Sequence, residues 1–376
     1  MSRTISRMSD GFTLLLPFPV FVLLAAVSGL GWSHARAEQS LLSSQESQNV
    51  TATKSELQIS ADLQVKTILD KMAAGGVARP TTVADVRKAY LFYPKLSGTP
   101  EHVFRIEDRQ IPGAGGDVPV RVYTPSSTSG LPMLVFFHGG GFVAGSLDSH
   151  DAPLRSVANR CECIVVSVAY RLAPENKYPA APEDAYSATK WVAEHVGDIG
   201  GDPRRIAVGG DGAGGNLAAV VTLMARERGT PNLVFQLLIY PSLDFSTVRP
   251  SWWAETDAPT ISREAKRDIS IAYLPITANL RDPFIAPIHA KDLRNLPPAL
   301  LITYEGDNPM RAEGDEYAER LKQDGVAIKV SVYPKVLHGF FLMAGDLDDG
   351  KRCIDEMAAA LRIAFEGRRQ DLPLKG

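Results

Sequence analysis

From residue 133 onward, short apolar runs alternate with amphipathic helical patterns, and this alternation constrains the fold more than any other feature. The apolar runs are Met133–Phe137, Ile164–Ala169, Ile206–Val208, Phe235–Tyr240, Ala299–Tyr304 and Ala327–Tyr333. The helical patterns include Asp184–His195, Asn216–Arg228, Ala312–Asp324 and Lys351–Phe365. Parallel strands are buried on both faces, so they are continuously apolar, and helices connect them. The pattern therefore predicts an α/β fold with a mainly parallel sheet flanked by helices.

Two helical patterns and two strand patterns precede this region. The helical patterns are Ala61–Ala74 and Thr82–Phe92, and Thr81 and Thr82 are candidate N-caps of the second. The strand patterns are Val103–Gln110 and Val118–Tyr123, which the turn sequence PGAGGD separates. With these two strands, we expect an eight-stranded domain at 101–376, preceded at 38–100 by a flexible polar lead-in and cap helices.

Residues 244–297 interrupt the alternation of strands and helices. The segment contains Trp252 and Trp253, several prolines and a single helical pattern near Arg263–Tyr273. Ligands of open α/β sheets bind at the carboxyl ends of the strands. An insertion at that edge would cover the binding crevice, so we interpret 244–297 as a helical cap.

The first 37 residues have the pattern of a signal peptide. Arg3 and Arg7 precede an apolar run at 12–32, and an A-x-A-like sequence at 35–37 follows it. This arrangement predicts cleavage after Ala37 and a periplasmic or secreted mature protein. The apolar run is long for a signal peptide, so an uncleaved membrane anchor is the competing interpretation.

The bulk composition argues against some partners. The formal net charge is -3 at pH 7, and 45% of the residues are hydrophobic, as in an ordinary globular chain. Nucleic acids and anionic membrane surfaces attract basic proteins, so this charge offers no electrostatic basis for binding either of them. We therefore expect no nucleic-acid partner.

The three cysteines are too few for a disulfide framework. Cys161 and Cys163 lie two residues apart at the start of a strand-like run, where their side chains would share one face. A disulfide at that spacing would be strained, so we expect two buried thiols there. Cys353 lies alone in a helical pattern and is also expected to be a buried thiol.

A glycine-rich loop follows the first of the apolar runs. Residues 138–142 read HGGGF. Consecutive glycines let backbone N–H groups approach a reacting oxygen, because no Cβ stands in the way. The sequence therefore matches the HGGG-type loop whose N–H groups stabilise an oxyanion in lipases and esterases.

Further motifs follow in a fixed order. The sequence reads SHD at 149–151, YRLAPE at 170–175, GDGAGGN at 210–216 and HGF at 338–340. Together with HGGGF, these motifs make the chain resemble the bacterial (family IV) esterases related to hormone-sensitive lipase, from about Ala61 to the C-terminal helix. The resemblance implies an α/β-hydrolase fold with a helical cap, action on short-chain acyl esters, and no metal or other cofactor.

The resemblance also implies roles for individual residues. The implied oxyanion donors are Gly139, Gly140 and Ala213, and the implied pocket walls are Phe142, Trp252 and Trp253. The family carries the SHD segment without a metal. His150, with Asp148 and Asp151 beside it, is therefore interpreted as structural.

The nucleophilic serine of the family is replaced in this chain. The family motif GDSAGGN is here GDGAGGN, so Gly212 occupies the serine position. The glycines also match the G-x-G-x-x-G fingerprint of dinucleotide-binding loops. That fingerprint needs an acidic residue about 20 positions later, at the end of the next strand, and Asp244 comes too late. The loop also follows several strands instead of opening the sheet, so we reject the cofactor interpretation.

The other two triad positions lie further along the chain. Counting back from Arg311 and Glu313 puts Asn308 where the family has its aspartate, with Asp307 immediately before it. His338 is the implied catalytic histidine, which completes the chain order of α/β-hydrolases. An asparagine can hold an imidazole but cannot stabilise its positive charge. Whether Asp307 replaces the family acid stays open.

Three functional hypotheses follow from these residues. The first is a pseudo-hydrolase that has lost most of its serine-esterase activity and keeps a pocket for a small ester-like ligand. The second is an active hydrolase in which His338 activates a water molecule, or in which another nucleophile acts. The third is an ordinary carboxylesterase in mutated form. The oligomeric state, a homodimer included, stays open.

Overall fold

The computed structural model describes residues 62–245, 262–305 and 308–367, all within one compact unit, Gln58–Gly376. The expected signal peptide, Trp252, Trp253 and Asp307 lie outside the described residues, as does the side chain of Asn308. Within these described ranges, no helix combines the length and the apolar character that a membrane span requires.

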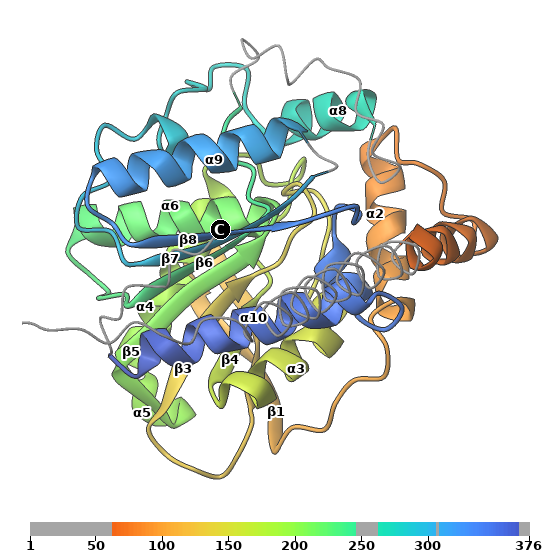
Figure 1. Cartoon of the computed structure of the whole chain (residues 1–376). Helices are drawn as coiled ribbons and strands as arrows, with labels where there is room; N and C mark the ends of the chain where they lie inside the picture. Colours follow the sequence, from red (N-terminus) through yellow and green to blue (C-terminus); the bar gives the residue numbers. More distant parts are fainter. Residues whose placement is uncertain (1–61, 246–261, 306–307, 368–376) are drawn as a thin grey trace, which may run out of the picture. The chain divides into compact units, whose positions relative to one another are not determined.

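The described residues contain an eight-stranded sheet with helices on both of its faces (Figure 1). The strand order is β1-β2-β4-β3-β5-β6-β7-β8. The pairs β1–β2 and β2–β4 are antiparallel, and all other neighbouring pairs are parallel. The strands are β1 Arg105–Gly113, β2 Gly116–Thr124, β3 Leu131–Phe137, β4 Ile164–Val168, β5 Gly201–Asp211, β6 Phe235–Ile239, β7 Ala299–Tyr304 and β8 Ile328–Tyr333. The prediction of an α/β fold with a mainly parallel eight-stranded sheet is confirmed.

The helices cover the two faces of the sheet and enclose two hydrophobic cores. They are α3 Asp151–Cys161, α4 Ala180–Glu194, α5 Val196–Ile199, α6 Ala213–Arg228, α9 Asn308–Gln323 and α10 Asp348–Phe365. Figure 1 shows α6 and α9 on one face and α3 and α10 on the other. Val135 and Phe137 of β3 pack in the core under α6 and α9, whereas Leu134 and Phe136 pack in the core under α3 and α10. Because alternate residues of β3 are buried on opposite faces, the strand is continuously apolar.

Two helices, α2 Val83–Phe92 and α8 Arg263–Tyr273, contact each other at one end of the sheet (Figure 1). Thr82 caps α2: its hydroxyl accepts a hydrogen bond from the Asp85 N–H, and the Asp85 carboxylate accepts one from the Thr82 N–H. Ser262 caps α8 by accepting from the Ala265 N–H. The predicted helices over these two segments are confirmed, and a further helix at 62–74 lies where it was expected.

The expectation of free thiols at Cys161 and Cys163 is wrong, because the two residues form a disulfide. Glu162 between them adopts the left-handed conformation, with a φ of 52°, and ends α3. The turn brings the two Cα atoms to 5.3 Å, within the usual range for a disulfide. The sequence interpretation placed both cysteines in one extended strand and therefore missed the turn. Cys353 is a buried thiol, as expected.

Candidate active site

Gly212 lies in the sharp turn between β5 and α6, at the carboxyl end of a central strand. Its φ is +54°, a conformation that residues with a Cβ rarely adopt. Two residues later the chain passes very close to β3, and a Cβ added to Gly214 would lie 1.9 Å from the carbonyl oxygen of Phe137. The turn therefore needs glycine at Gly214 for space, and it has the strained strand–turn–helix geometry of a nucleophile elbow.

His338 faces Gly212 from the loop between β8 and the short 3-10 helix η4, Phe340–Met343. A Cβ added to Gly212 would lie 3.6 Å from Nε2 of His338 and would meet nothing closer. A hydroxyl carried on that carbon could come within hydrogen-bonding reach of the imidazole. The structure thus brings together the expected nucleophile position and the expected catalytic histidine, which are far apart in the sequence.

The other ring nitrogen of His338 contacts Tyr304, the last residue of β7. The distance between Nδ1 of His338 and Oη of Tyr304 is 3.0 Å. The ring of Tyr240 packs against the same imidazole, with 4.9 Å between the ring centroids. Tyr304 was not among the expected site residues, because it ends an apolar strand and belongs to no motif.

The HGGGF loop follows β3 and has positive φ angles at Gly140, Gly141 and Phe142. Gly140 and Gly141 line a pocket together with Ala213, the first residue of α6. Gly139 does not line this pocket, since its N–H donates to Oδ1 of Asp211 at 2.8 Å. The structure differs here from the expectation that Gly139 is an oxyanion donor, because the sequence does not tell which N–H group of a glycine run faces inward.

Asp211 and His150 form a fully buried pair next to the elbow. Nε2 of His150 is 2.9 Å from Oδ1 of Asp211. Asp148 and Asp151 turn instead toward Arg121, at 2.8 Å and 3.3 Å. His150 of the SHD segment therefore supports the elbow, whereas Asp151 of that segment and the preceding Asp148 form ion pairs with Arg121. Among the described residues, no cluster of three or more His, Cys, Asp or Glu side chains is arranged to hold a metal ion.

His138 opens the HGGGF loop and is buried beneath it. Burial, together with the neighbouring His150, lowers the pKa of His138 to about 4, so the imidazole is neutral at physiological pH. Its ring stacks on Tyr170 at 4.3 Å, and the Tyr170 hydroxyl donates to its carbonyl oxygen at 2.7 Å. Tyr170, the first residue of the YRLAPE motif, thus holds the loop in place.

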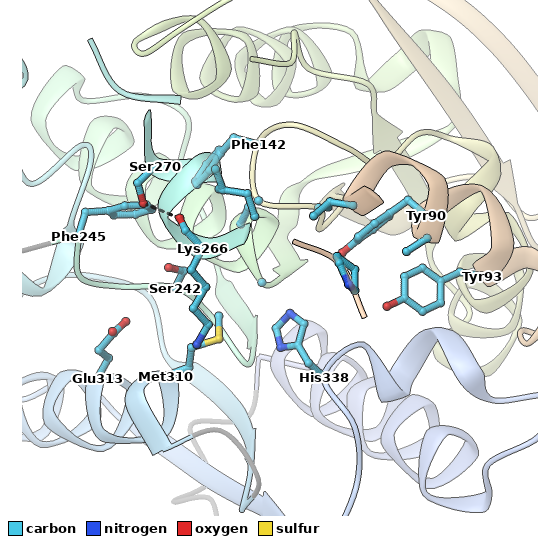
Figure 2. Close-up of a pocket in the computed structure, with 18 residues that line it drawn as sticks. Tyr90, Tyr93, Phe142, Ser242, Phe245, Lys266, Ser270, Met310, Glu313 and His338 are labelled. Atoms are coloured by element: carbon cyan, nitrogen blue, oxygen red, sulfur yellow. Dashed lines mark hydrogen bonds between the residues drawn. The ribbon is translucent and has the colours of Figure 1, made fainter. Parts of the chain in front are cut away.

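Gly212 and His338 line a mostly apolar pocket of ≈ 110 Å³. Figure 2 shows His338 among the side chains around it. Its walls come from α2 and α8, from the segment after β6 and from the start of α9. The side chains that line it include Val86, Ala89, Tyr90, Tyr93, Phe142, Ser242, Phe245, Lys266, Ile269, Ser270, Met310 and Glu313. The helices α2 and α8, which lie in the two segments expected to form a cap, therefore contribute directly to the pocket.

Most of these wall residues were not identified from the sequence. Phe142 is the expected residue that the structure places in the wall, where its ring stacks on Tyr273 at 3.8 Å. Lys266, Ile269 and Ser270 line the pocket from one face of α8, at the spacing of three and four residues that places helical side chains together. That spacing predicts that these residues share one face of the helix, but it does not predict that this face lines a pocket.

Glu313 of α9 is buried beside the pocket and supports its wall. Its Oε2 accepts hydrogen bonds from the N–H groups of Leu243, at 2.9 Å, and Asp244, at 3.1 Å. These bonds tie α9 to the segment that follows β6. Glu313 was not among the expected site residues, and its two hydrogen bonds give it this supporting role.

Comparisons with known proteins agree with this fold and site. A family model described as the alpha/beta hydrolase fold matches residues 134–342. Esterase LipI of Mycobacterium tuberculosis (strain ATCC 25618 / H37Rv) is 40% identical over 287 residues, which cover 75% of this chain and 88% of the relative. Carboxylesterase NlhH of the same strain is 45% identical over 268 residues, 69% of this chain and 83% of the relative. A solved esterase structure from the archaeon Pyrobaculum calidifontis has a TM-score of 0.70 at 41% identity, covering 74% of this chain and 91% of that one.

The segment that matches the family model runs from β3 to η4. It contains the glycine-rich loop, the elbow and the histidine, and it spans more than half of the chain. The chain belongs to the α/β-hydrolase family and is related to carboxylesterases.

Proposed function

We propose that the pocket is a carboxylesterase site that binds small acyl esters and in which Gly212 stands at the nucleophile position. The observation that carries the proposal is the 3.6 Å between Nε2 of His338 and the Cβ position of Gly212. In an α/β-hydrolase the serine hydroxyl extends from this point to the histidine. The relatives named as esterases support the same assignment. In this proposal the chain is a carboxylesterase in mutated form, in which Gly212 has taken the place of the nucleophilic serine.

The pocket supplies the remaining contacts that an ester needs. Gly140 and Gly141 line the pocket, and Ala213 begins α6, where the helix dipole favours negative charge. In the proposed site these groups bind the carbonyl oxygen, and the aromatic wall around Phe142 holds the acyl or alcohol chain. Binding of the ester is therefore retained, whereas the covalent step is lost or strongly impaired.

Restoring the serine tests the proposal. The Gly212→Ser variant is expected to hydrolyse short-chain p-nitrophenyl esters, with release of p-nitrophenolate followed by absorbance. A folded serine variant that neither binds nor hydrolyses these esters would show that the pocket is not an ester site.

A second candidate function is direct hydrolysis by a water molecule that His338 activates. The space at Gly212 favours it, since the nearest atoms to the added Cβ position are Nε2 and Cε1 of His338, at 3.6 Å and 3.9 Å. General base catalysis contributes typically about 10²–10⁴-fold. The unmodified chain should then hydrolyse p-nitrophenyl acetate slowly, and His338→Ala should reduce the rate to that of buffer. Equal rates for the two proteins would rule this route out.

We further propose that the chain is exported and cleaved after Ala37, on the basis of the apolar run at 12–32 and the sequence at 35–37. Intact-mass measurement of the protein isolated from the cell envelope or the medium should give a chain that begins at Glu38. A mass that includes the first 37 residues would favour the membrane anchor instead.

A further inference from the structure

We propose that Tyr304 is a positioning residue for His338, with a hydroxyl that holds the imidazole at Nδ1 and sets which ring nitrogen carries the proton. The contact is direct, since Oη and Nδ1 lie 3.0 Å apart. Nδ1 is the atom that the acid of a triad normally contacts. The contact is a feature of the structure, whereas its importance for ester hydrolysis rests on the proposed function.

Tyr304 is held in place by the residues that pack around it. The residue is 1% exposed and ends β7, where it pairs with Tyr333 of β8. Its ring meets Tyr240 edge to face, with 6.0 Å between the centroids. Neighbouring strands and packed rings thus hold the phenol, so its hydroxyl is a pre-organised partner for the histidine.

The chemistry follows from the two nitrogens of a neutral imidazole, of which one donates a hydrogen bond and the other accepts. Nε2 of His338 faces the Gly212 position, so the ring can accept a proton there only when Nδ1 carries the hydrogen. The Tyr304 oxygen can accept a hydrogen bond from Nδ1–H and thereby favours this tautomer. A tyrosine hydroxyl in this place orients the ring but does not supply the negative charge of a carboxylate.

The tautomer of His338 can be measured in the full-length, unsubstituted protein without any ester present. In ¹⁵N-labelled protein, the two imidazole nitrogens differ in chemical shift according to which one carries hydrogen. We expect the Nδ1–H tautomer to predominate in the unmodified chain, and the Nε2–H tautomer to increase in Tyr304→Phe. Tyr333→Phe is the matched control. It removes the hydroxyl of the paired residue on β8, which donates to Glu356 at 2.9 Å, and it should leave the tautomer ratio of His338 unchanged.

Activity supplies a second measurement in the Gly212→Ser protein. Adding Tyr304→Phe should lower kcat by about tenfold with little change in KM, because one hydrogen bond to the base is lost while the pocket stays intact. Adding Tyr333→Phe should change neither constant. This split separates positioning of the base from a general loss of folded protein, which would affect both tyrosine variants.

Several outcomes would overturn the proposal. One is an unchanged tautomer ratio in folded Tyr304→Phe, and another is a predominant Nε2–H form in the unmodified chain, which would mean that Tyr304 donates to Nδ1. If Tyr304→Phe does not fold, 3-fluorotyrosine at position 304 keeps the size of the ring and weakens the oxygen as an acceptor. It should increase the Nε2–H form, and no increase would contradict the role. Failure of Gly212→Ser to turn over esters would count against the proposed function alone, since the NMR measurement needs no catalysis.

Discussion

Replacing Gly212 by serine should raise the turnover of p-nitrophenyl butyrate by a factor of about 10³ or more. The new Cβ would lie 3.6 Å from Nε2 of His338, so its hydroxyl would have a base within reach. Loss of a triad nucleophile typically costs roughly 10⁶ in turnover, and the remaining contacts still accelerate the reaction by about 10³–10⁴ over water. Because those contacts are in place, restoring the hydroxyl should recover a large part of the lost rate. Initial rates at saturating ester measure the gain.

Gly212→Ala is the matched control for this experiment, since it adds the same Cβ without a hydroxyl. It should leave the rate at the level of the unmodified chain, and His338→Ala should abolish the gain of the serine variant. Two further changes in the serine variant locate the acid. A rise in kcat with Asn308→Asp would favour Asn308 as the acid position, whereas loss of activity with Asp307→Asn would favour Asp307. A folded protein that carries both Gly212→Ser and Asn308→Asp and shows no gain in turnover would contradict the proposed carboxylesterase site.

The largest expected loss of stability comes from Gly214→Ala, which should lower the free energy of unfolding by about 3 kcal/mol. The added Cβ would lie 1.9 Å from the carbonyl oxygen of Phe137, which is backbone and cannot move aside like a flexible side chain. Either β3 or α6 must shift, and β3 is an inner strand of the sheet on which α6 packs. Urea unfolding followed by circular dichroism measures the change.

Gly197→Ala is the matched control for Gly214→Ala. Gly197 is likewise the second residue of its helix, α5, and an added Cβ there meets no heavy atom within 4 Å. Its effect should stay within about 0.5 kcal/mol. Gly212→Ala should fall between the two, at about 1–2 kcal/mol, because the strain at a φ of +54° is not accompanied by a clash. Equal losses at Gly214 and Gly197 would contradict the role of close packing at the elbow.

Much of the fold could be predicted because its elements have strong local patterns. β7 has the predicted bounds, Ala299–Tyr304, since a strand buried on both faces is apolar from end to end. α8 also has the predicted bounds, Arg263–Tyr273, and Ser262 caps it. β5, Gly201–Asp211, extends beyond the predicted run Ile206–Val208 at both ends. Gly201, Gly209 and Gly210 pair with β3 through their backbone, which a hydropathy pattern does not detect.

The site was predictable only where a motif spans it. The motifs indicated Gly212, His338 and the glycine loop, and the structure places Gly212 and His338 face to face. Nothing local distinguishes Tyr304 from any other residue at the end of a strand, and its contact with His338 joins β7 to the loop after β8. For a similar reason, the sequence does not show that the N–H of Gly139 donates to Asp211. The direction of its N–H depends on Asp211, which lies far away in the sequence.

By itself, the sequence determined the α/β architecture, the order of the motifs and the absence of a hydroxyl at Gly212, because each of these depends on residue type and short-range pattern. Only the tertiary structure decided which groups meet: His338 with the empty Cβ position of Gly212, Tyr304 with Nδ1, and the cap helices with the pocket. These contacts form between the carboxyl ends of strands and a cap that are distant along the chain. Their geometry depends on strand order, turn conformation and the packing of helices across the sheet, which local patterns do not specify.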